Sequence, residues 1–157
     1  MAGTLIFHGK LYGYSESDDN HKFCRGRRFF CNNRKERNNG CGRTSSVWAA
    51  DKLKRLRLGA NILWAFFKLV IVSGNKAQAL RDLNVDFSIS SAYRVWKRFE
   101  NSQSHIRAAL SKCVAPPGLP QSNQPADQTI AHLETVFPGD PCPIVAFQQQ
   151  LQIAFFS

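Results

Sequence analysis

Short apolar runs alternate with polar turns over the first 48 residues. The segments TLIFHGKLYGY (4–14), KFCRGRRFFC (22–31) and RTSSVW (43–48) are rich in β-branched and aromatic residues, and the stretches between them have turn chemistry. The pattern therefore predicts a small N-terminal antiparallel β-ribbon over residues 1–48. Such a ribbon buries little apolar surface, so it needs a bound metal or a neighbouring domain for stability.

Apolar residues recur at helical spacing from residue 49 onward. A basic amphipathic stretch (49–57) leads into residues 58–72, which are apolar around nearly the whole helix circumference, as in the central helix of a compact helical domain. A short helix over 76–83 and a longer helix over 89–112, capped by Ser88, follow. This order predicts a trihelical domain of the helix-turn-helix type over residues 49–112.

The remaining residues differ in pattern from the predicted helix-turn-helix domain. Residues 113–125 form a proline-rich linker, and residues 126–157 form a C-terminal helical segment, with helices expected over 126–136 and 143–156. The second of these has an apolar stripe that must be buried, either on the core or between two protomers. The fold class predicted for the whole chain is therefore α+β.

Charge separates the same regions. The residues before Cys113 carry all 21 Lys and Arg and eight of the 11 Asp and Glu, a formal charge of +13, whereas the residues from Cys113 onward carry −3. The basic part therefore has a polyanion as its expected partner, and double-stranded DNA is the polyanion that fits a helix-turn-helix. The alternative is an ordinary trihelical core with solvated cations.

Two groups of residues are candidates for DNA contact. The major groove admits one α-helix, so the second helix of the pair must present its outer arc to bases and phosphates. On that arc we place Ser90, Ser91, Arg94, Lys97 and Arg98. The basic residues of the ribbon and its loop would bind phosphates, and they are Arg25, Arg27, Arg28, Arg34, Lys35 and Arg37.

Several classes of protein are disfavoured by the sequence. The longest apolar run, 58–72, is interrupted by Asn61 and Lys68 and is shorter than the roughly 20 residues of a membrane span. No signal-peptide pattern is present, and the five cysteines are an odd number, so we expect a reducing, cytoplasmic location. No phosphate-binding loop, nucleophile elbow or metalloprotease motif occurs, and no acid sits on an apolar strand of the kind that fixes a metal-binding carboxylate, so we expect a non-catalytic protein.

The cysteines raise the possibility of a structural zinc ion. Zinc takes four nitrogen or sulfur ligands, usually as two close pairs. The set within reach along the chain is His21, Cys24, Cys31 and Cys41. The alternative is that Cys24 and Cys31 are small apolar residues of a strand. Cys113 and Cys142 have no expected role.

The segments HGKLYGY, RGRRFFCNN and GCGRT, followed by the trihelical pattern, resemble the zinc-ribbon and helix-turn-helix N-terminal regions of bacterial insertion-element transposases and of small stand-alone proteins associated with such elements. The resemblance covers about residues 5–110. It implies that Cys31 and Cys41 are the second cysteine pair of a zinc ribbon. The first pair of those proteins precedes the first strand, where this sequence has Met1, Ala2 and Gly3. Either the metal site is incomplete, or translation begins upstream, or His21 and Cys24 substitute.

The resemblance also indicates which partners the protein is expected to bind, and two other functions remain as alternatives. It implies a non-catalytic DNA-binding protein that acts beside a separate transposase chain or a second protomer. One alternative is a truncated transposase remnant, acting as a protein-interaction module or without function. Another is an RNA-binding protein whose ribbon stacks bases on Tyr14, Phe29 and Phe30.

Overall fold

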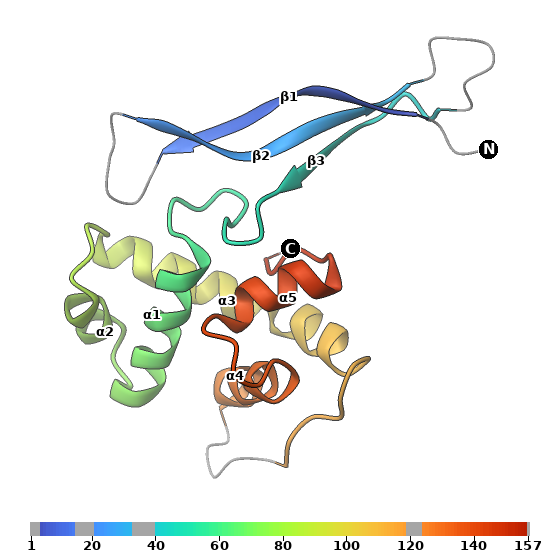
Figure 1. The fold of residues 1–157 in the computed structure, drawn as a ribbon. Coiled ribbons are helices and arrows are strands. Elements are labelled where there is room, and N and C mark those ends of the chain that lie inside the picture. The colour runs from blue at the N-terminus through green and yellow to red at the C-terminus, as the bar shows by residue number, and fades with distance from the viewer. Residues whose placement is uncertain (1–3, 15–20, 33–39, 119–123, 157) are drawn as a thin grey trace.

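The computed structural model describes residues 4–14, 21–32, 40–118 and 124–156. In these residues an N-terminal three-stranded antiparallel sheet is followed by five helices (Figure 1), which confirms the predicted α+β class. The strands are β1 (Leu5–Tyr14), β2 (Lys22–Cys31) and β3 (Thr44–Trp48), in the spatial order β1-β2-β3. Their ends lie within one residue of the strands predicted from the β-branched and aromatic runs of the sequence.

The register of the sheet decides which side chains share a face. Paired residues point to the same side, and the side alternates along each strand. Two irregularities, at Phe7/Gly9 and at Leu11/Tyr12, shift the pairing of β1 with β2. One face, here called the open face, consists of Leu5, Phe7, Lys10, Tyr12, Tyr14, Lys22, Cys24, Arg27, Phe29, Cys31, Ser45 and Val47.

The helices are α1 (Ala60–Ser73), α2 (Lys76–Leu83), α3 (Ile89–Leu110), α4 (Pro125–Val136) and α5 (Pro143–Leu151). Each corresponds to an apolar periodic stretch of the sequence. Two expectations for the helical part of the chain were wrong. The last predicted helix does not reach residue 156, because Gln152 adopts a left-handed conformation with φ of 56° and the chain leaves the right-handed helix there.

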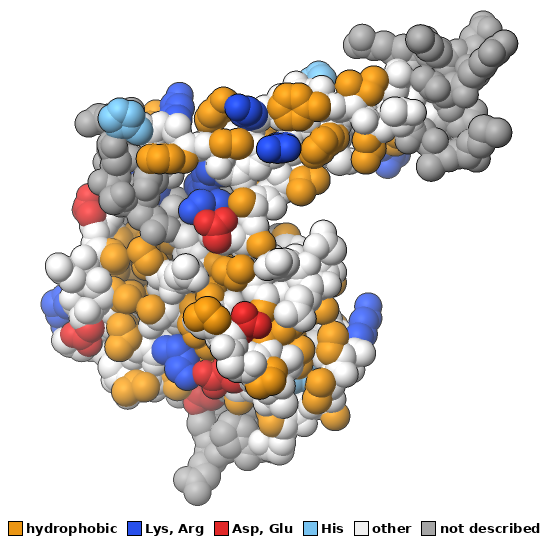
Figure 2. Space-filling view, in the orientation of Figure 1, with side chains coloured by type: hydrophobic (Ala, Val, Ile, Leu, Met, Phe, Trp, Pro, Cys, Tyr) orange, Lys and Arg blue, Asp and Glu red, His pale blue; other side chains and the backbone are white. Residues whose placement is uncertain are grey.

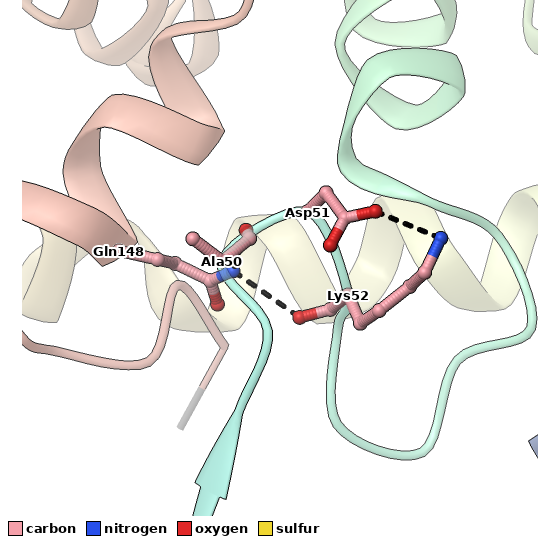
Figure 3. A network of polar contacts seen from close by, with 4 residues as sticks. All are labelled: Ala50, Asp51, Lys52 and Gln148. Carbon is pink, nitrogen blue, oxygen red and sulfur yellow. Dashed lines mark hydrogen bonds and ion pairs between the residues drawn. The ribbon is translucent and has the colours of Figure 1, made fainter. Parts of the chain in front are cut away.

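The basic stretch 49–57 is the second error, because it is not helical. It forms turns and a single bridge between Lys52 and Gly59, and Arg55 has a φ of 60°. The amide of Gln148 on α5 holds this segment by donating to the carbonyl oxygens of Ala50 and Lys52 at 2.6 and 3.2 Å (Figure 3). Long-range side-chain contacts therefore override the local helical periodicity.

All five helices contribute to one core. Its centre is a set of stacked rings: Phe67 lies 4.3 Å from Phe99, and Phe99 lies 6.2 Å from Phe155, centroid to centroid. Phe155 follows α5 and is fully buried. The C-terminal segment therefore covers the core, the first of the two roles that its apolar stripe predicts.

The sheet lies beside the helices as a long projection, joined to them through residues 49–59 (Figure 1). Its open face contributes no residue to the buried core. Basic side chains lie between hydrophobic ones along the sheet surface (Figure 2). The molecule thus consists of a packed helical unit (residues 60–118 and 124–156) and a sheet that remains largely open to solvent.

Candidate nucleic-acid interface

The candidate interface begins with the turn that leads into α3. Ser88 accepts a hydrogen bond from the backbone N–H of Ser91 at 3.2 Å, which satisfies an otherwise unpaired donor of the first helical turn. At the other end of the turn, Asn84 closes α2 in a left-handed conformation with φ of 48°. Asparagine tolerates this conformation better than most residues. The two caps fix a short turn between α2 and α3.

The N-terminal half of α3 has one apolar and one polar side. Ala92, Val95 and Phe99 face the core and are buried. Ser90, Arg94 and Lys97 are exposed, at the spacing that places them on one side of a helix. Lys97 forms a 3.1 Å ion pair with Glu100, so its charge is partly shared, whereas Arg94 is exposed beside it.

Two of the expected DNA contacts are placed differently. Arg98 is half-buried: its guanidinium donates to the carbonyl oxygen of Lys54 at 3.1 Å and covers the ring of Phe156 at 4.7 Å. Desolvation, with the nearby charge of Arg55, lowers the pKa of Arg98. Ser91 is also half-buried, and its hydroxyl accepts from Ser88 at 2.8 Å. The prediction for Arg98 was therefore wrong, because its side chain packs on Phe156, whereas Ser91 remains partly exposed in the first turn of α3.

Tyr93 was missed by the sequence reasoning. It is exposed, next to Arg94, and the Lys76 ammonium group lies 5.5 Å from its ring centroid. Lys76 also lies 5.2 Å from the Trp96 ring, so this lysine bridges α2 and α3. An aromatic residue on the polar side of an otherwise amphipathic helix was the signal that could have identified Tyr93.

The six basic residues predicted to bind phosphates from the ribbon divide into three groups. Arg25 is buried, and its side chain packs over Gly13, where a Cβ would lie 2.5 Å from the arginine Cδ. Its expected role as an exposed phosphate contact was wrong, since the irregular pairing at this point turns it inward. Arg27 and Arg28 are exposed on opposite faces of β2. Arg34, Lys35 and Arg37 lie outside the described residues.

The four predicted zinc ligands do not come together. Cys24 and Cys31 are seven residues apart on the same strand, which separates their Cα atoms by about 23 Å. His21 lies before the same strand, on the side away from Cys31. Among the described residues no group of three or more His, Cys, Asp or Glu is placed to hold a metal ion. The predicted set of four zinc ligands was therefore wrong, because the extended strand β2 holds His21 and Cys24 far from Cys31.

Cys31 and Cys41 are nevertheless neighbours at one end of the sheet. The backbone N–H of Cys41 donates to the sulfur of Cys31 at 3.3 Å, and Gly42 follows with a φ of 67°. Hydrogen bonding from the backbone of Arg43, together with Cys31, lowers the pKa of the Cys41 thiol. Two thiols of this kind supply half of a tetrahedral zinc site. Bound zinc therefore stays a prediction, restricted to this pair.

Comparison with known proteins finds no matching family model, no matching curated protein and no matching solved structure. The resemblance to insertion-element transposases therefore stays a hypothesis that depends on the motifs alone. In the part of the chain that the structure describes, no helix combines the length and the apolar character needed to cross a bilayer.

Proposed function

We propose that the protein is a non-catalytic DNA-binding protein related to the transposases of mobile elements, with α3 as its recognition helix. The observation that carries the proposal is the exposed N-terminal surface of α3, where Ser90, Tyr93 and Arg94 lie together above a fully packed core. A helix must present side chains in this way to reach base edges in the major groove. The packed core gives that surface the rigidity that readout requires.

Each exposed group has a distinct role in this proposal. Arg94 donates to a guanine edge or a phosphate, and Ser90 contacts a base near the N-terminus of α3. Lys97 must exchange its ion pair with Glu100 for a phosphate, so we expect it to contribute less than Arg94. On the sheet, Arg27 and Arg28 contribute phosphate contacts that strengthen binding to every sequence.

Three of the acids that the structure describes are paired with lysines rather than with one another. Asp51, Glu100 and Glu134 form ion pairs with Lys52, Lys97 and Lys68, respectively. Paired acids on separate elements do not resemble the clustered carboxylates that hold two metal ions in DNA-cleaving enzymes. We therefore propose that any strand cleavage belongs to a separate transposase chain.

A selection experiment tests the proposal. The full-length protein would be used to select duplexes from a randomised pool, and its preference would be compared with that of Arg94→Gln. Lys112→Gln is the matched control, because it removes the same charge from an exposed position just beyond the C-terminal end of α3, and the helix from Arg94 to Leu110 alone spans about 24 Å.

We expect Arg94→Gln to lose discrimination at one or two base positions, by about tenfold or more per position. Lys112→Gln should retain the selected sequence. Identical preferences for the unmodified protein and Arg94→Gln, or no enrichment of any sequence, would contradict the assignment of α3 as the recognition helix.

A further inference from the structure

The open face of the sheet carries large side chains that nothing in the described structure covers. Leu5, Phe7, Tyr12 and Val47 are 62%, 53%, 58% and 56% exposed, and Tyr14 lies at the end of the same row. Phe7 also meets Phe29 across the strands, edge to face, at 6.1 Å between ring centroids. An exposed apolar surface of this extent is characteristic of a binding site.

Charge on this face indicates the kind of partner. Lys10 and Arg27 are direct cross-strand neighbours, and both are exposed. Like charges directly opposite one another destabilise a sheet, and the described residues of this face include no acid to offset them. A bound anion between the two side chains would remove that repulsion.

The order of side chains along the face matches a nucleotide strand. Phe7 and Phe29 lie on one side of the Lys10–Arg27 pair, and Tyr12 lies about 6.8 Å further along β1. Beyond Tyr12, the Lys22 ammonium group lies 5.6 Å from the Tyr14 ring centroid, so cation and ring alternate again. Aromatic platforms separated by cations are the arrangement that binds stacked bases and their phosphates.

We propose that the open face binds an unpaired DNA strand. One phosphate lies between Lys10 and Arg27, and bases stack on the rings of Phe7 and Tyr12. An intact duplex cannot use this surface fully, because its bases are already stacked inside the helix and only their edges are accessible. A protein partner fits less well, since burying the Lys10–Arg27 pair without counterions costs desolvation energy.

The choice of DNA over RNA rests on the function proposed for α3. If α3 holds a duplex, a strand opened next to that duplex is available to the sheet of the same molecule. The protein then has a site for paired DNA centred on α3 and a site for unpaired DNA on the open face, and Arg27 can bind a phosphate of either.

Fluorescence anisotropy with the full-length protein tests the inference. The probes are a labelled 12-nucleotide oligothymidylate, an abasic strand of the same length, the matching oligouridylate RNA, and a duplex as an independent readout. The variants are Tyr12→Leu, which removes a ring and keeps an apolar side chain, and Lys10→Gln. Phe23→Leu is the control, because Phe23 is 50% exposed on β2 but points to the opposite face. All of these positions are exposed, and circular dichroism would verify that each variant folds.

We expect the oligothymidylate to bind at least about tenfold more tightly than the abasic strand, since stacking requires the bases. Tyr12→Leu and Lys10→Gln should each weaken oligothymidylate binding by about tenfold, and Phe23→Leu by less than about twofold. Duplex binding should be insensitive to Tyr12→Leu.

Equal affinity for the thymidylate and abasic strands would overturn the inference, as would an unchanged affinity of Tyr12→Leu. Tighter binding of the RNA by tenfold or more would overturn the choice of DNA. Concentration-dependent self-association that Tyr12→Leu abolishes would instead assign the face to a second copy of the chain. If Arg94→Gln left the affinity for the duplex unchanged while the thymidylate strand still bound, this result would contradict only the function proposed for α3 and not the binding of an unpaired strand to the open face.

Discussion

The sheet and the helical unit use apolar residues in opposite ways. In the helical unit the large rings are buried against one another, with Phe67, Phe99 and Phe155 fully enclosed. In the sheet, rings such as Phe7 and Tyr12 remain more than half exposed, and the strands are held by backbone pairing. The comparison indicates that stability resides in the helical core, while the apolar surface of the sheet is available for binding.

The largest expected difference between the two regions concerns ring removal. Phe99→Ala should lower the free energy of unfolding by about 3–5 kcal/mol, because it opens a cavity among rings that cannot collapse freely. Phe7→Ala, the matched change on the sheet, should cost only about 0.5–1 kcal/mol, since it removes one cross-strand contact. Urea unfolding followed by circular dichroism measures both values. Equal losses would contradict the division between a stabilising core and an open sheet.

A smaller and more local effect is expected at Gly26. A Cβ at this position would lie 2.4 Å from the carbonyl oxygen of Val47 and 3.0 Å from the Cα of Trp48, so the backbone of β3 would have to move. Gly26→Ala should therefore destabilise the pairing of β2 with β3 by about 1–3 kcal/mol. Hydrogen exchange should accelerate at the amides of β3 and remain unchanged in α1 and α3.

Gly118→Ala is the control for that experiment, because a Cβ there would have no heavy atom within 4 Å. Its exchange pattern should match that of the unmodified protein. If Gly26→Ala accelerated exchange equally in the sheet and in α3, the two regions would unfold as one unit and the comparison would fail.

Local pattern was sufficient for most of the elements. Runs of β-branched and aromatic residues predicted β1 and β2, and the Ser88 cap predicted the start of α3 correctly. Both signals depend only on neighbours along the chain. Segment 49–57 was missed because its conformation is set by Gln148, which lies far away in the sequence and reaches its carbonyl oxygens.

The candidate site was less predictable than the fold. Helical spacing correctly placed Arg94 on the exposed side of α3, but it gave the same expectation for Arg98, which packs on Phe156. Spacing along one helix cannot reveal which side chains a distant segment covers. The separation of Cys24 from Cys31, by contrast, could have been predicted, because the strand expected over residues 22–31 already contained both cysteines.

The salt dependence of duplex binding is the most direct test of the central claim that α3 and its neighbouring cations bind a DNA duplex. Affinity for a selected duplex would be measured by anisotropy from low to physiological ionic strength, for the unmodified protein, Arg94→Gln and Lys112→Gln. We predict a steep fall of affinity with salt, with a logarithmic slope that is smaller by about 0.9 in Arg94→Gln and unchanged in Lys112→Gln. An affinity that does not change with salt, or an equal change of slope in both variants, would contradict the account.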